Sequence, residues 1–137
     1  MFDHAAALVA FVKLAGVAQS KSQWAQRDKF LLLAGIAAAR AGFSSVAARC
    51  RELVLSHNPH HLIKGYATIE ESLVDTDFQP FLVQLQRFCS YELAEHFLTQ
   101  LQIAPGLPTR GNGLGAAEYA MLLLSKADLQ PGVAESG

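Results

Sequence analysis

The chain has 137 residues, of which 51% are apolar and 17% charged, and its formal net charge at pH 7 is −1. A chain of this length and apolar content can bury a core of its own, which excludes intrinsic disorder and favours one compact domain. The charged fraction is low for a soluble domain and the mean hydropathy is positive, +0.21, so we expect some apolar surface to contact a partner.

The two halves of the chain carry opposite charge. Residues 1–64 hold eight basic and three acidic side chains, and residues 65–137 hold three basic and nine acidic ones, which gives net charges of +5 and −6. Such charges either neutralise each other within the folded domain or favour self-association, so a homodimer is one expected state. Nucleic-acid binding is not expected, because no aromatic side chains alternate with the basic ones to stack on bases.

Neither an export signal nor a membrane span is predicted. A signal peptide begins with basic residues, whereas Asp3 is the only charge before the apolar residues 5–12, and Lys13 interrupts that run. Uncharged stretches such as residues 30–39 are too short to cross a bilayer. We therefore expect a cytoplasmic protein without membrane contact.

The apolar periodicity is helical throughout, which predicts an all-α fold of six or seven helices in an antiparallel array. The first helix is expected to start at an Asp3 cap and run for about four turns, apolar on nearly every face, as in a buried or interface helix. The second is expected over residues 23–41, from an N-cap at Ser22 to a left-handed stop at Gly42. Its apolar stripe holds Trp24, Arg27, Leu31, Ala34 and Ala38.

Capping residues divide the rest of the chain. The expected N-caps are Ser44, Thr68, Asp75 and Ser90, with Thr68 and Glu71 forming a reciprocal capping box. The expected helices are 45–56, 59–64, 69–74, one that ends near residue 88 with Pro80 in its first turn, 91–102 and 116–127. Core positions in the third helix are Val46, Ala47, Cys50, Leu53 and Val54, and those in the 91–102 helix are Leu93, Ala94, Phe97, Leu98 and Leu101.

Composition also divides the chain into four expected segments. Residues 1–104 form the helical array, and residues 105–115 form a linker rich in glycine and proline. Residues 116–127 form a C-terminal helix, and residues 128–137 a disordered tail. Because of the linker, the C-terminal helix is a candidate for exchange between the two protomers of a dimer.

Residues 28–61 resemble one tetratricopeptide repeat, a helix–turn–helix unit of 34 residues. The match rests on Gly35, Ala38, Gly42, Ala47 and Pro59. These residues stand where the repeat has its small-residue contacts, its interhelical glycine, its packing alanine and its terminal proline. Leu31 and Arg51 depart from the pattern, because the family prefers large aromatic residues there. The resemblance implies stacked helix pairs whose concave face binds a peptide or a partner helix. A close contact between the two helices is predicted at Ala34, Ala38, Ala47 and Cys50.

Histidines supply the candidate metal ligands. They are His57, His60 and His61 at a predicted helix junction, with His96 as a further ligand. No metalloprotease spacing accompanies them, and capping or solvated roles explain them as well. A metal-binding protein or metal-dependent hydrolase is therefore the alternative function, and no metal site is assigned.

Other reactive groups have structural explanations. The segment from Arg110 to Gly115 precedes a helix and could bind an anion, but it lacks the spacing of known phosphate loops. The acidic residues Glu70, Glu71, Asp75 and Asp77 fit capping roles better than a calcium loop. Cys50 and Cys89 are expected to be buried, reduced thiols.

These observations favour a non-enzymatic α-helical module that binds a protein or peptide partner. No catalytic residue and no cofactor are predicted. Neither the partner nor the biological process follows from the sequence.

Overall fold

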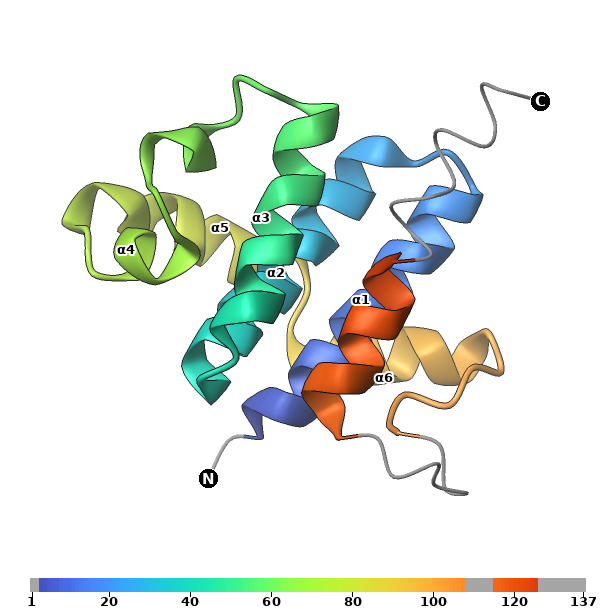
Figure 1. Ribbon diagram of the computed structural model, residues 1–137. Helices are drawn as coiled ribbons and strands as arrows, with labels where there is room; N and C mark the ends of the chain where they lie inside the picture. The colour runs from blue at the N-terminus through green and yellow to red at the C-terminus, as the bar shows by residue number, and fades with distance from the viewer. Residues whose placement is uncertain (1–2, 108–114, 126–137) are drawn as a thin grey trace.

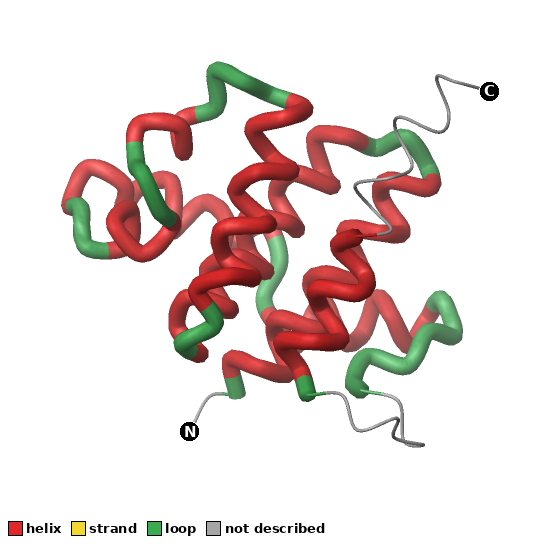
Figure 2. The backbone as a smooth tube through the Cα atoms, viewed as in Figure 1, coloured by secondary structure: helices red, strands yellow, loops and turns green. Residues whose placement is uncertain are grey.

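The structure is a computed structural model, described here for residues 3–107 and 115–125. This part of the chain contains helices and no strand, so the predicted all-α fold is confirmed (Figures 1 and 2). The elements are α1 (His4–Ser20), α2 (Trp24–Ala41), α3 (Ser44–His57), the 3-10 turn η1 (Leu62–Gly65), α4 (Ile69–Leu73), the 3-10 turn η2 (Thr76–Phe78), α5 (Gln79–Phe88) and α6 (Tyr91–Gln100). Residues 116–125 form a further helical segment.

Side-chain caps set three of the helix starts as predicted, and a fourth predicted cap, Asp75, begins the 3-10 turn η2 and not α5. The Asp3 carboxylate accepts a hydrogen bond from the backbone N–H three residues later, at 3.0 Å. The hydroxyls of Thr68 and Ser90 do the same, each at 3.1 Å. Asp75 accepts from the N–H two residues later at 3.0 Å and begins η2. These short-range contacts satisfy backbone donors that have no partner within the helix.

Three helices end in the same backbone motif. Ser22, Gly42 and Gln102 have left-handed backbone conformations, with φ of 58°, 86° and 62°. In each case the next residue's N–H donates to the carbonyl five residues before it, at 2.8 Å, as in a Schellman motif. The stop at Gly42 is confirmed. The predicted N-cap at Ser22 is wrong, because this residue instead closes α1.

Four other local predictions need correction. Ser44 is the first residue of α3 and not its cap. Helix α6 ends at Gln100 and not at residue 102 as predicted, because Gln102 adopts a left-handed backbone conformation. The expected 59–64 helix is shorter, since only η1 forms there. In the capping box, the Glu71 carboxylate accepts from the Ala67 N–H at 3.4 Å, one residue earlier than predicted.

Small residues bring α2 and α3 close together. The two helices are antiparallel, since Arg27 at the start of α2 contacts the backbone of Leu53 near the end of α3. A Cβ atom placed on Gly35 would overlap the Ile69 side chain and lie 3.1 Å from the Cβ of Cys50. A side chain at this position would require Ile69 and Cys50 to shift, and the four residues predicted at the close contact are all fully buried.

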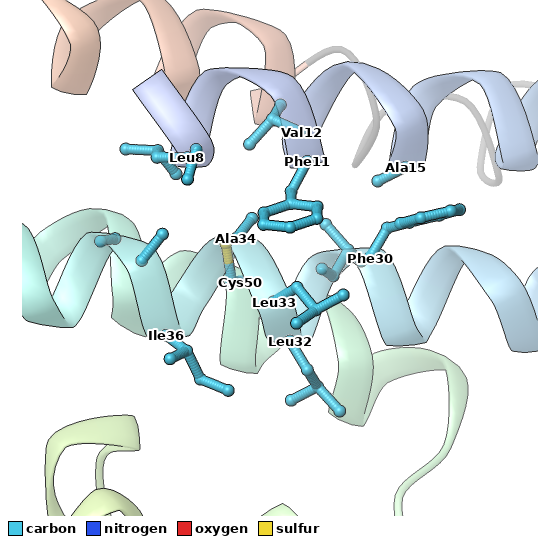
Figure 3. Packing of buried hydrophobic residues seen from close by; sticks show 14 of the residues in the cluster. Leu8, Phe11, Val12, Ala15, Phe30, Leu32, Leu33, Ala34, Ile36 and Cys50 are labelled. Carbon is cyan, nitrogen blue, oxygen red and sulfur yellow. The ribbon is translucent and has the colours of Figure 1, made fainter. Parts of the chain in front are cut away.

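Helix α1 lies between other elements of the same chain. It packs along α2, and Phe11 and Leu8 point toward that helix in Figure 3. It also contacts α6 and the 116–125 segment, drawn in red in Figure 1. In that segment Ala120 and Leu124 are fully buried in the same hydrophobic cluster as α1. The almost uniformly apolar character of α1 is thus accounted for within one chain.

Lys13 of α1 binds the segment that follows α6 through two backbone carbonyls. Its ammonium group donates to the carbonyl oxygens of Ala104 and Gly106 and lies 5.4 Å from the centre of the Tyr119 ring. Partial burial lowers the pKa of Lys13 from its ordinary value. Residues 126–127 of the predicted C-terminal helix and the predicted tail, 128–137, lie outside the described residues.

None of the helices in residues 3–107 and 115–125 combines the length and the apolar character that crossing a bilayer requires.

Replacing Ala47 by leucine tests the close contact between α2 and α3. The larger side chain has no space beside Gly35, so we expect the free energy of unfolding to fall by about 1–3 kcal/mol. Ala48, the next residue, is exposed and provides the matched control, for which Ala48→Leu should change stability by less than about 0.5 kcal/mol. Urea denaturation measures both. Equal stability of the two variants would contradict the tight packing.

Replacing Leu124 by alanine tests whether the C-terminal helical segment belongs to the core. Leu124 is 0% exposed whereas Leu122 is 46% exposed, so Leu124→Ala should cost about 2–5 kcal/mol and Leu122→Ala less than about 1 kcal/mol. Thermal and urea unfolding at several protein concentrations provide the measurement. A concentration-dependent effect of Leu124→Ala would instead indicate that the segment packs on another protomer.

Candidate functional site

The most deeply buried charge in the described residues is Arg27 of α2, which is 2% exposed. Its Nη1 donates to Oε1 of Gln19 in α1 at 2.8 Å, and its Nη2 donates to the Leu53 carbonyl in α3 at 2.9 Å. The guanidinium also lies 5.1 Å from the centre of the Trp24 ring and 3.4 Å from Asp28. One cation thus holds three helices together. In the sequence, the position of Arg27 on an otherwise apolar helical stripe was the feature that could have indicated its burial.

Asp28 and His57 form a second contact between α2 and α3. The Asp28 carboxylate is buried and lies 2.6 Å from Nδ1 of His57, the last residue of α3. The imidazole is partly exposed and stacks on Trp24, with ring centres 5.6 Å apart. A carboxylate behind a histidine fixes the orientation of the ring, which is also how catalytic bases are held. Catalysis would further require a nucleophile or a bound substrate.

His61 has a structural role. Its Nδ1 accepts a hydrogen bond from the Ile63 N–H at 3.0 Å and caps η1, while its ring meets Phe81 edge-on at 5.5 Å. Burial lowers the pKa of His61, and the nearby negative charge of Asp28 opposes that shift. The neutral ring is the form that can accept the capping hydrogen bond.

The four histidines considered as metal ligands have separate environments. His57 contacts Asp28, His60 is exposed in the turn after α3, His61 caps η1, and His96 lies on α6 with its ring 6.4 Å from Phe97. Over residues 3–107 and 115–125, no three His, Cys, Asp or Glu side chains are grouped so that they could hold a metal ion.

Two of the four acidic residues in the α4–η2 region, Glu71 and Asp75, cap backbone N–H groups. Asp75 caps η2 and accepts a second hydrogen bond from the Tyr66 hydroxyl at 2.9 Å, which raises the pKa of Tyr66. Glu71 accepts from a backbone N–H, Glu70 is partly buried, and Asp77 donates its own N–H to Asp75. The expected capping roles are thus confirmed for the carboxylates of Asp75 and Glu71.

Both cysteines are buried and reduced, as predicted. Burial raises the pKa of Cys50 to about 12 and that of Cys89 to about 11. The thiolate is the reactive form of cysteine, so neither side chain is an activated nucleophile near neutral pH.

Most of the glycine-rich loop considered for anion binding, residues 108–114, lies outside the described residues. The N–H of Gly115 donates to the Glu118 carboxylate at 2.9 Å. That bond uses one of the donors on which an anion at this helix start would depend.

Helix α6 presents the clearest candidate binding surface. Leu93, Phe97 and Leu101 are 37%, 37% and 43% exposed, although all three were predicted to face the core. That prediction is wrong because the adjoining strip of the helix, with Ala94 and Leu98, already fills the contact with α1 and leaves the three side chains at the edge of that contact. Four-residue spacing places the three exposed side chains in one row, hereafter the α6 ridge.

A groove of about 210 Å³ runs beside the α6 ridge. Its walls come from α1 and α2, with Leu14, Val17 and Phe30 opposite Phe97 and Leu101. Gln23 and Gln100 supply polar groups at the same groove. An apolar row next to a groove with polar groups resembles the anatomy of protein-binding surfaces.

The sequence and fold were compared with known proteins. No family model, no curated protein and no solved structure matches this chain.

Replacing Arg27 by methionine tests the charged cluster. Methionine keeps the apolar volume but leaves the Asp28 carboxylate without the cation, so we expect a loss of about 3–5 kcal/mol. Arg49 provides the control, because its pair with Glu52 lies at the surface at 3.0 Å, and Arg49→Met should cost less than about 1 kcal/mol. Adding Asp28→Asn to Arg27→Met should restore part of the loss. Similar, mild effects of both arginine variants would show that the cluster contributes little.

Proposed function

We propose that this chain is a non-enzymatic protein–protein interaction module that binds an apolar helical segment of a partner along the α6 ridge. The observation that carries the proposal is the exposure of Leu93, Phe97 and Leu101 beside the buried strip of α6 formed by Ala94 and Leu98. Apolar side chains gathered in this way on a monomer's surface are typical of binding sites. The same proposal places the protein in the cytoplasm, the location expected from the sequence.

The shape of the surface favours a helix as the bound element. Leu93 and Leu101 are eight positions apart, so the ridge extends for about 12 Å along α6. A partner helix with apolar residues three and four positions apart can pack its own row beside this ridge and into the groove at Phe30. The polar groups of Gln23 and Gln100 can bond to the rim of such a helix.

A second copy of this chain is another partner supported by an independent observation. Residues 1–64 carry a net charge of +5 and residues 65–137 carry −6. In a two-fold dimer, the ridges of two protomers would supply affinity and the opposed charges would orient the two chains. The tetratricopeptide-like segment, residues 28–61, would serve as the support on which α1 and α6 are held.

Replacing Phe97 by aspartate tests the proposed binding surface. Helical peptides selected from a random library against the native chain should bind Phe97→Asp at least about tenfold more weakly, because exposed aromatic side chains supply much of the affinity at such surfaces. Val83 of α5 is also exposed and provides the matched control, so Val83→Asp should retain full affinity. Calorimetric titration measures binding, and thermal unfolding verifies that both variants are folded.

Two results would count against the proposal. One is a failure to select any peptide, and the other is equal binding by Phe97→Asp and the native chain. Sedimentation velocity at micromolar concentrations and two salt concentrations examines the dimer separately. A monomer under all conditions would exclude the second copy as the partner without affecting the peptide result.

A further inference from the structure

A second cavity lies where α1, α2, α5 and α6 meet, on a different set of residues from the α6 ridge. Its volume is about 310 Å³, at the lower end of the range for small-molecule pockets. Phe11, Ile36, Ala37 and Leu82 supply apolar walls. The proposed protein-binding function does not use this cavity.

Two polar side chains at the cavity, those of Cys89 and Tyr91, have partners of their own. The Cys89 thiol donates to the Ser90 carbonyl at 3.4 Å, and burial keeps its pKa near 11, so it contributes a neutral wall. The Tyr91 hydroxyl donates to Glu95 at 2.6 Å. These side chains therefore enclose the cavity and offer little polar recognition of their own.

Arg40, in the last turn of α2, differs from these groups. Its side chain lines the cavity and is exposed, and no hydrogen bond or ion pair joins it to another residue in the part of the chain that the structure describes. Its five N–H donors are arranged to bind a carboxylate at two points. Glu92 of α6 is also exposed and lines the same cavity, where its negative charge would repel an anion.

We propose that this cavity binds a small carboxylic acid with a short hydrocarbon chain. The chain occupies the space between Phe11, Ile36 and Leu82, and the carboxylate bonds to the guanidinium of Arg40. The small volume favours a short chain, and the apolar walls favour a hydrocarbon over a sugar or a nucleotide. The inference is independent of peptide binding at the α6 ridge.

Octanoate and octanol serve as matched probes, because they share a hydrocarbon chain and differ in charge. Octanoate should bind one molecule per chain in calorimetric titrations, and its largest amide chemical-shift changes should include Ala37 and Cys89. Arg40→Gln should weaken octanoate binding by about two- to fivefold, as expected for a partly exposed ion pair. Glu92→Gln should strengthen it by about twofold, and neither change should alter octanol binding.

Three outcomes would overturn the inference. They are no saturable binding of octanoate at millimolar concentration, shift changes confined to residues outside the cavity, and equal octanoate binding by Arg40→Gln and the native chain. Both substitutions change exposed side chains, so the variants should fold, which thermal unfolding verifies. The Phe97→Asp variant should still bind octanoate, so this inference and the proposed function can fail separately.

Discussion

The buried guanidinium of Arg27 is the interaction on which the arrangement of the first three helices depends. Apolar side chains tolerate small shifts of one helix along another, whereas a cation removed from water requires hydrogen-bond acceptors at defined positions. Those acceptors are the Gln19 side chain on α1 and the Leu53 carbonyl on α3. The contact of Asp28 with His57 adds a second fixed point between α2 and α3. The positions of these helices along one another are therefore set by polar contacts within an otherwise apolar core.

Close packing then determines which surfaces remain for binding. Gly35 lets α3 and α4 approach α2, and α1 is covered by α2, by α6 and by the C-terminal helical segment. Helix α6 packs against α1 through Ala94 and Leu98, and the ridge centred on Phe97 runs along the edge of that contact. The proposed binding surface is thus the part of α6 that remains exposed once this helix has packed against α1. Exposed apolar side chains of this kind are what the low charged fraction of the sequence led us to expect.

Several of the reactive side chains have structural roles in the fold. Burial keeps the thiols of Cys50 and Cys89 protonated near neutral pH. His61 caps η1, and Asp75 caps η2 while it also accepts from Tyr66. In each case the group that could do chemistry is engaged in a structural hydrogen bond or removed from solvent.

The sequence by itself determined the features that depend on neighbouring residues. Helical periodicity predicted the all-α fold and the buried face of α3, and local capping patterns predicted the roles of Asp3 and Ser90. The tertiary structure alone decided which face of α6 is covered and which partners surround Arg27, since Leu53 lies 26 residues away. Caps and periodicity arise from contacts within a turn or two of helix, whereas burial depends on elements brought together only when the whole chain folds. An apolar position such as Phe97 is therefore identifiable from spacing, but its exposure is not.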